Sequence, residues 1–339
     1  MKQRKGDTIC FARPPAVTAW AAVAGKKEGE GPLAAFFDEI EPDTRAGEKT
    51  WEAAESAYQK RAFALLLRKA GLQIGQLDCL FGGDLENQCT GTAYTARGLD
   101  VPFAGVYGAC STMAESLGLA ACFAAAGFAG RAAAMTSSHF CTAERQFRTP
   151  LEYGGQRTPT AQWTATCAGA CLVEADGTGP AVRAVTFGRV RDLGVRDINN
   201  MGAAMAPAAA STIAHYLQDT QTDPAQLDAV YTGDLGAVGS RLLGQLLAQQ
   251  GIVLRRHDDC GLLLYDRQTQ QVKAGGSGCG CSAGVLCAHI LPALQSGRQR
   301  RVLLVSTGAL MSQLTFQQGE SIPGVAHLVE LTAPPEKAQ

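Results

Sequence analysis

The sequence lacks the residue patterns of a metal site. Its five histidines are scattered over 339 residues and form no cluster. Cys279 and Cys281 form one close cysteine pair and Cys167 and Cys171 another, but neither has histidine partners at the spacing of a structural zinc site. We therefore expect no bound metal and no cofactor.

The sequence also lacks a strong charge of one sign and a long apolar run. Lys and Arg number 30 against 31 Asp and Glu, and no basic block stands out beyond Arg298, Arg300 and Arg301. This balance argues against nucleic acid as the main partner. No signal-like segment follows the basic start, and no run approaches the roughly 18 apolar residues of a spanning helix. Twelve cysteines without a signal segment predict reduced thiols in a reducing compartment.

One stretch organises the rest of the chain. Residues 101–107 are short and apolar, which predicts a buried strand, and Gly108 and Ala109 supply a tight turn. Residues 111–127 are so rich in Ala, Leu, Cys and Gly that we expect a helix buried nearly all round. Cys110 then lies at the start of this helix, where free backbone NH groups and the helix dipole favour an anion.

Two interpretations of Cys110 follow from this position. The helix start can stabilise a thiolate, or it can bind the carboxylate or carbonyl oxygen of a ligand. Alternatively, Cys110 is a small buried apolar residue, as most free cysteines are. The predicted strand, turn and helix place Cys110 at the tip of a turn and not within the core.

The segments before Cys110 are less informative. Residues 51–70 show helical spacing of Ala, Tyr and Leu, with Thr50 as N-cap and Gly71 as the stop. Residues 12–50 predict an irregular segment with short pieces of structure. Residues 77–85 predict a strand that ends in a loop, and residues 131–138 predict another strand.

The chain contains an internal repeat. Residues 227–235 repeat residues 77–85 at an offset of 150, with Leu, Asp, Gly, Asp and Leu identical. A helix from about 207 to 217 precedes the second copy, residues 275–282 open a second small-residue helix, and residues 301–308 match residues 131–138. We therefore predict a duplicated α/β fold with halves at 1–178 and 179–339.

This duplication predicts the architecture and a shared site. Two mixed sheets should enclose a buried helix layer, giving layers in the order α-β-α-β-α. The strand-end loops at 84–90, 108–112, 234–240 and 275–282 should meet at one place. From these four loops we single out Asp84, Cys110, Ser111, Asp234 and Ser277 as candidate ligand-binding residues.

The Gly-Ala-Cys-Ser tip in the first of two similar halves resembles the thiolase superfamily, above all its ketoacyl synthase branch. More narrowly, seven ordered blocks resemble the stage V sporulation protein AD family. The blocks are residues 81–88, 107–112, 136–139, 142–148, 152–156, 257–261 and 275–278.

This resemblance implies a function and a setting. It implies a protein of the forespore and spore that lies peripherally on the inner spore membrane. The implied ligand is dipicolinic acid, alone or as its calcium chelate. Binding would serve uptake of this ligand into the developing spore and hence spore germination. The partners it implies are the other stage V sporulation A proteins of the SpoVA complex. Homodimerisation is expected by analogy of fold.

The resemblance also identifies catalytic partners that this chain lacks. Condensing enzymes of this fold pair the cysteine with a His and with a second His or an Asn. Residues 233–236 stand where a His-containing loop is usual, and Cys279 stands near the usual Asn. We therefore expect a binding protein without catalytic residues. The alternatives are an acyl transferase that uses Cys110 with an altered triad, and a purely structural member of an assembly.

A binding site for a dicarboxylate needs hydrogen-bond donors and cationic side chains. The Cys110 and Ser111 region can supply NH donors, and Arg145 and Arg148 are the best cations, although both also suit a solvated helix surface. Asp84 and Asp234 can bind a protonated acid, fix an arginine, approach calcium or simply shape their loops. His139, just beyond a strand end, is a further candidate for the pocket.

Overall fold

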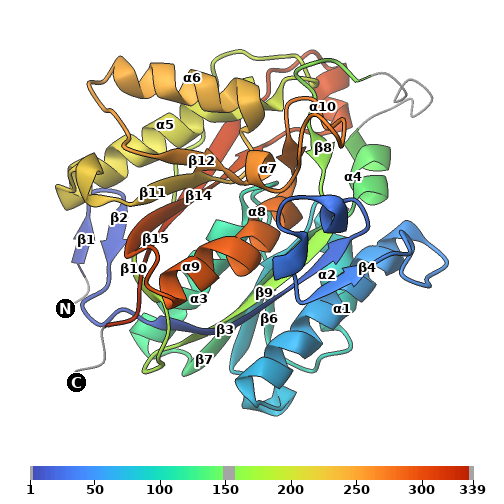
Figure 1. Ribbon diagram of the computed structural model, residues 1–339, viewed down its shortest axis with the longest axis vertical. Helices are drawn as coiled ribbons and strands as arrows, with labels where there is room; N and C mark the ends of the chain where they lie inside the picture. Colours follow the sequence, from blue (N-terminus) through green and yellow to red (C-terminus); the bar gives the residue numbers. More distant parts are fainter. Residues whose placement is uncertain (1–2, 148–156, 336–339) are drawn as a thin grey trace.

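The computed structural model describes residues 3–147 and 157–335. Its centre is a large mixed sheet made of two groups of strands (Figure 1). The order in the N-terminal group is β6-β5-β7-β9-β3, and that in the C-terminal group is β10-β15-β14-β11-β12. One residue pair, Ala16 of β3 and Ala181 of β10, joins them. The N-terminal strands are β3 (Ala16–Gly25), β5 (Cys79–Gly83), β6 (Phe103–Gly105), β7 (Arg131–Ser138) and β9 (Cys167–Glu174).

The C-terminal group repeats the pattern of the N-terminal one. Its strands are β10 (Ala181–Thr186), β11 (Ala229–Thr232), β12 (His257–Asp259), β14 (Arg301–Ala309) and β15 (Gly324–Thr332). β5 is parallel to β6 and β7, as β11 is to β12 and β14, while β9 and β15 run antiparallel to their neighbours. The predicted duplicated α/β fold is therefore confirmed. The boundary predicted after residue 178 lies in the connection between β9 and β10.

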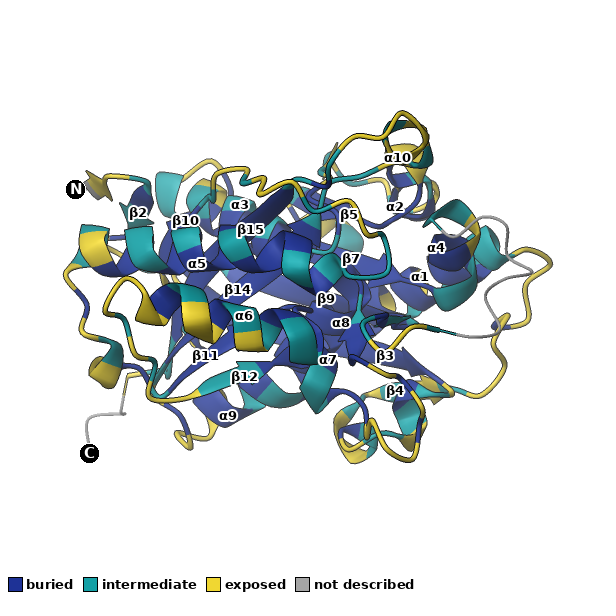
Figure 2. Ribbon diagram, turned by 90° about the horizontal axis from the view of Figure 1, so that it is seen from above, coloured by how far each residue is buried: buried dark blue, intermediate teal, exposed yellow. Residues whose placement is uncertain are grey.

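Helices cover both outer faces and fill the space between the two groups. α1 (Trp51–Ala70) packs on β3 and β9, and α5 (Met201–Thr220) packs on β14 and β15 beside α6 (Gly236–Ala248). Between the groups lie α3 (Thr112–Ala126) and α8 (Cys279–Val285), the latter continued by a π-helical turn, Leu286–Ile290, and α9 (Leu291–Gln295). The layers follow the predicted order, and the central strands are buried (Figure 2).

Shorter elements surround this frame. β1 (Gln3–Lys5), β2 (Thr8–Cys10) and β4 (Glu39–Glu41) extend the sheet, and β8 (Trp163–Thr164) pairs with β13 (Gly276–Ser277). The remaining helices are α2 (Thr90–Ala96), α4 (Phe140–Phe147), α7 (Cys260–Leu263) and α10 (Gln313–Gln317).

The ends of α1 confirm the sequence prediction. The Thr50 side chain accepts a hydrogen bond from Ala53 N, and Gly71 ends the helix at a φ of 66°. A side-chain acceptor at the N-cap satisfies one backbone donor, and glycine adopts the left-handed conformation at little cost. The local signals of the sequence are therefore sufficient to set this helix.

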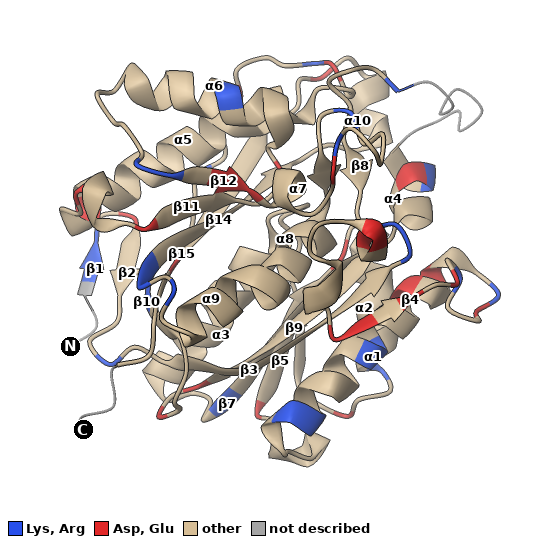
Figure 3. Ribbon diagram, in the orientation of Figure 1, with Lys and Arg blue, Asp and Glu red and all other residues tan. Residues whose placement is uncertain are grey.

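The middle layer depends on small side chains. A Cβ on Gly169 of β9 would lie 2.8 Å from the Ala283 Cβ of α8. α8 and α9 carry no charged residue (Figure 3). The segment Ala109–Ala126 is long and apolar enough to cross a membrane, contrary to the prediction that no run approaches this length. It comprises the turn before α3 and α3 itself, which is apolar because it packs between the two groups of strands.

Two sequence predictions were wrong in part. Residues 12–50 contain β3, a ten-residue strand that the predicted irregular segment missed, because its alanine-rich sequence is a poor strand signal. The predicted buried strand at 101–107 is only β6, whose Ala104 and Gly105 are exposed. β6 pairs with β5 on one side only among the described residues, since it is the last strand of its group.

Candidate functional site

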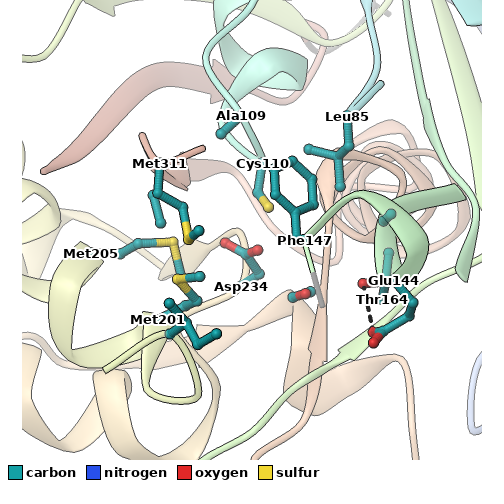
Figure 4. A pocket seen from close by; sticks show the side chains of 14 residues that line it. Leu85, Ala109, Cys110, Glu144, Phe147, Thr164, Met201, Met205, Asp234 and Met311 are labelled. Atoms are coloured by element: carbon teal, nitrogen blue, oxygen red, sulfur yellow. Dashed lines mark hydrogen bonds between the residues drawn. The ribbon is translucent and has the colours of Figure 1, made fainter. Parts of the chain in front are cut away.

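The turn before α3 fixes the position of Cys110. Ala109 adopts a left-handed φ of 51°, and the Gly108 carbonyl accepts hydrogen bonds from Ser111 N at 3.0 Å and Ser111 Oγ at 2.6 Å. Thr112 Oγ1 donates to the Ala109 carbonyl at 2.6 Å. These bonds direct the Cys110 side chain into a cavity (Figure 4). They also occupy the polar groups of Ser111, which is fully buried and does not line the cavity.

Asp234 lies opposite Cys110 and comes from the other half of the chain. It follows β11, and Thr307 Oγ1 donates to its Oδ1 at 2.7 Å, while Gly278 N donates to its Oδ2 at 3.0 Å. The Cys110 side chain faces this carboxylate, close enough for each group to shift the pKa of the other. Asp234 is fully buried. The two halves therefore each supply one member of a thiol and carboxyl pair.

The surroundings raise the pKa of both groups. Burial raises the pKa of the Cys110 thiol well above its ordinary value, and the nearby Asp234 charge raises it further. Burial also raises the pKa of Asp234 to about 7, although the hydrogen bonds from Thr307 and Gly278 oppose the shift. A nucleophilic cysteine needs a lowered pKa, so this environment disfavours the thiolate.

The cavity is narrow and mostly apolar. Its volume is about 80 Å³, and its walls come from α4, α5, the strands β8, β13 and β14, and five loops. The only charged residues among the described lining are Asp234 and Glu144. Glu144 forms an ion pair with Arg157 at 3.0 Å, and Arg157 lies over the rings of Phe140 and Trp163. The lining residues are Leu85, Ala109, Cys110, Ala143, Glu144, Phe147, Thr164, Ile198, Met201, Met205, Asp234, Ser277, Ala309 and Met311.

The structure brings three of the predicted site residues together. Cys110, Asp234 and Ser277 line the same cavity, as expected from the meeting of their loops. Asp84 does not line it. The Asp84 carboxylate accepts hydrogen bonds from Glu86 N at 2.8 Å and from Thr92 N and Thr92 Oγ1, both at 2.6 Å. Asp84 therefore shapes its own loop, one of the roles that the sequence left open.

The other predicted residues lie elsewhere. His139 Nε2 bonds the Thr44 carbonyl at 2.9 Å, and burial lowers the pKa of its imidazole, so this neutral ring serves the packing around α1. Arg145 forms an ion pair with Glu52 of α1 and lines a separate surface depression. Arg148 lies outside the described residues.

Sequence reasoning missed the thioether wall of the cavity. Met201, Met205 and Met311 are three of the six methionines of the chain, and all line this cavity (Figure 4). Met201 and Met205 are one helical turn apart on α5, so their side chains lie on one face. That spacing was the available signal, but methionines at helical spacing are more often ordinary core residues.

The cavity lacks the partners of a condensing cysteine. No histidine or asparagine occurs among the described lining residues. Cys279, which stands near the position of the usual Asn, is fully buried, and its thiol donates to the Ser137 carbonyl at 2.9 Å. Within residues 3–147 and 157–335, no group of three or more His, Cys, Asp or Glu side chains is arranged to hold a metal ion.

The two-fold repeated α/β layers with a cysteine at the start of the buried helix α3 define a thiolase-like fold. OleA of Xanthomonas campestris in a cerulenin complex is 15% identical with a TM-score of 0.60, covering 97% of this chain and 99% of that one. The 3-oxoacyl-[acyl-carrier-protein] synthase III of Aquifex aeolicus is 13% identical with a TM-score of 0.55, covering 94% and 99%. At this identity the likeness concerns the fold alone.

Closer similarity defines the family. The model of the stage V sporulation protein AD family matches residues 5–332. The stage V sporulation protein AD of Bacillus subtilis strain 168 is 44% identical over 328 residues, which are 96% of this chain and 97% of that protein. The chain belongs to the stage V sporulation protein AD family, which gives it a role in sporulation.

Proposed function

We propose that this sporulation protein binds dipicolinic acid in the Cys110 cavity and does not transform it. Uptake of this pyridine dicarboxylate into the developing spore is the role that follows from such binding. The observation that carries the proposal is the pairing of the Cys110 thiol with Asp234 where a condensing enzyme needs a base. A neutral thiol beside a carboxyl group suits ligand recognition and disfavours acyl transfer.

The cavity offers contacts for both parts of such a ligand. The thioethers of Met201, Met205 and Met311 make favourable contacts with aromatic rings, typically about 0.3–1.5 kcal/mol each. At the polar end, a protonated Asp234 donates a strong hydrogen bond to a ligand carboxylate, because a bond from O–H to a charged oxygen is short and strong. The Ser277 hydroxyl lies in the same wall and is a second donor.

The net charge of the lining sets a limit on this binding. Asp234 and Glu144 are acidic, and the described lining contains no Lys or Arg. Arg157, which is paired with Glu144, is the cation that compensates the nearer charge. A dianionic ligand therefore gains most when Asp234 holds its proton.

Calorimetric titration of the purified protein with dipicolinic acid, with and without calcium, tests the proposal. We expect saturable binding to the unaltered protein and to a Cys141→Ala control, whose thiol lies outside the cavity. Binding to Asp234→Ala should be at least about tenfold weaker, because the donor at the polar end is removed. Tighter binding with calcium identifies the chelate as the ligand. Equal binding to Asp234→Ala would refute the assignment of the cavity.

An acyl transferase with an altered triad is the second candidate. It is favoured by one observation, the retention of a cysteine at the start of the buried helix. Mass spectrometry after incubation with acyl-CoA distinguishes the two. Acylation confined to Cys110 would support the enzyme, and an unmodified Cys110 in a protein that binds dipicolinic acid would support the binder.

The proposal includes partners. We infer a homodimer from the exposed edge of β6, which ends beside the Cys110 turn, and from the exposed Phe128, whose ring contacts Phe123, which in turn contacts Phe81 of the neighbouring strand β5. An unpaired strand edge is a template for pairing with another chain. We also propose attachment to the inner spore membrane through the other stage V sporulation A proteins. Co-purification of those proteins from sporulating cells tests this attachment.

A further inference from the structure

A second cavity adjoins the Cys110 cavity on its outer side. Its volume is about 400 Å³, and it lies between the loop after β5, the end of β6 and the start of α10. Phe147 and Met311 line both cavities, so their side chains form the wall between them. Tyr107, which is 42% exposed, and Leu314 supply apolar surface. We call this second cavity the outer groove.

Carboxamide side chains are concentrated in the outer groove. Gln146 is held in place, because its Oε1 accepts from Asn87 N at 2.9 Å and its Nε2 donates to the Leu85 carbonyl at 2.8 Å. The side chains of Gln88 and Gln313 make no hydrogen bond within the described part of the chain, although both line the groove. Two neutral donors are thus available to a carboxylate there.

The loop that carries Gln88 is held in an uncommon conformation. Gln88 and Cys89 have φ values of 61° and 53°, two successive left-handed residues that are not glycine. Each such residue costs about 1–2 kcal/mol. The bonds from Glu86 N and Thr92 to Asp84 fix both ends of this loop. Strain of this kind persists where the surroundings determine it, and it is concentrated at ligand-binding positions.

The Cys110 cavity, which is the inner of the two, is small, so a ligand needs a route into it. About 80 Å³ of space is available beside Cys110. For comparison, an engineered apolar cavity of about 150 Å³ binds benzene, which is smaller than dipicolinic acid. An aromatic dicarboxylate therefore enters only if wall side chains move. Met311, with three rotatable bonds in its side chain, and Phe147 are the wall residues that face both cavities.

We propose that the outer groove is an entry site for aromatic carboxylates, in which the ligand binds before it passes between Phe147 and Met311 to Cys110. The ring stacks on Tyr107, and the carboxylates accept hydrogen bonds from the carboxamides of Gln88 and Gln313. This inference rests on the proposed function, since it uses the same ligand class. It adds a second site and a two-step binding reaction.

Stopped-flow mixing with dipicolinic acid, followed by the near-ultraviolet absorbance of the ligand, tests the entry site. The observed rate should saturate with ligand concentration in the unaltered protein. Gln88→Glu with Gln313→Glu keeps side-chain shape but repels a carboxylate, so the half-saturating concentration should rise about tenfold. The equilibrium affinity of the inner site should change less than about twofold. Gln245→Glu, on an exposed position of α6, is the matched control for added charge.

The wall is tested separately with Phe147→Ala. This variant should raise the maximum observed rate at least about fivefold, because a smaller side chain opens the passage. A rate that rises linearly with ligand in the unaltered protein would overturn the inference, as would saturation that the double Glu variant leaves unchanged. Absence of any binding in calorimetry would refute the proposed function as well, so the two failures are distinguishable.

Discussion

The protonation of Asp234 makes ligand affinity depend on pH near neutrality. The pKa of this buried carboxyl is raised to about 7, and its protonated form is the one that donates to a ligand carboxylate. Carboxylic acids of the ligand have ordinary pKa values near about 4, so the ligand remains charged across the range of interest. Affinity should therefore fall as pH rises through 7.

The size of the effect follows from the protonated fraction. With a pKa of about 7, Asp234 is about nine-tenths protonated at pH 6 and about one-tenth protonated at pH 8. The apparent dissociation constant should increase about tenfold between these two values, which is about 1.4 kcal/mol. Calorimetry at pH 7 in buffers of different ionisation enthalpy should also report uptake of about half a proton for each ligand bound.

Two variants make the origin of the pH dependence clear. Asp234→Asn has a permanent donor at this position and should bind with nearly the same affinity at both pH values. Glu86 is the main competing origin, because burial raises its pKa to about 7 as well. Glu86→Gln should keep the tenfold change. Flat binding in the unaltered protein, or a pH dependence that persists in Asp234→Asn, would refute the reasoning.

Three further predictions concern the same centre. Iodoacetamide should alkylate Cys110 slowly at pH 8 and at least about threefold faster in Asp234→Asn, as measured by mass spectrometry, because the neighbouring charge that raises the thiol pKa is gone. The Asp234 pKa is raised from 3.8 to about 7, so the folded state holds a proton that the unfolded state releases. The free energy of unfolding in urea should therefore fall between pH 5 and pH 8, and it should fall less in Asp234→Asn than in the unaltered protein. Gly308→Ala would place a Cβ 2.1 Å from the Gly108 carbonyl and should cost about 1–3 kcal/mol in urea unfolding, whereas Gly244→Ala, with open space around it, should stabilise α6 by up to about 1 kcal/mol.

The architecture could be predicted largely because the sequence contains an internal repeat. The repeat of residues 77–85 at 227–235 and the two small-residue helices gave the layers and the meeting of the loops. β3 was not predicted because alanine, its commonest residue, has a low preference for strands. β6 was expected to be buried because its residues are apolar, but its position at the end of the sheet is a property of the topology.

The site could be predicted only where the residues lie directly at strand or helix ends. Cys110, Asp234 and Ser277 satisfy that condition and line the cavity. His139 and Arg145 follow a strand end too, but they bond Thr44, in the segment predicted as irregular, and Glu52, at the start of α1, and no sequence pattern indicates either contact. The methionine wall needed the packing of α5 against the loop after β14, which no local pattern specifies.

The duplication places a thiol beside a carboxyl group twice, yet only one of these places is open. Asp234 of the second half faces Cys110 at the start of α3. At the start of α8, burial raises the pKa of Cys279 most, and Glu55 and then Asp84 of the first half raise it further. Asp84, however, is occupied by Thr92 and Glu86 N, and the Cys279 thiol by the Ser137 carbonyl. The Asp234 carboxylate accepts bonds from Thr307 Oγ1 and Gly278 N, and it lines the Cys110 cavity. The repeated fold alone would make the two places alike, so the difference lies in the source of these bonds. Asp84 is bonded by the loop and helix that follow it, whereas Asp234 is bonded by Thr307 of β14 and by Gly278 before α8 and still lines a cavity that a ligand can use.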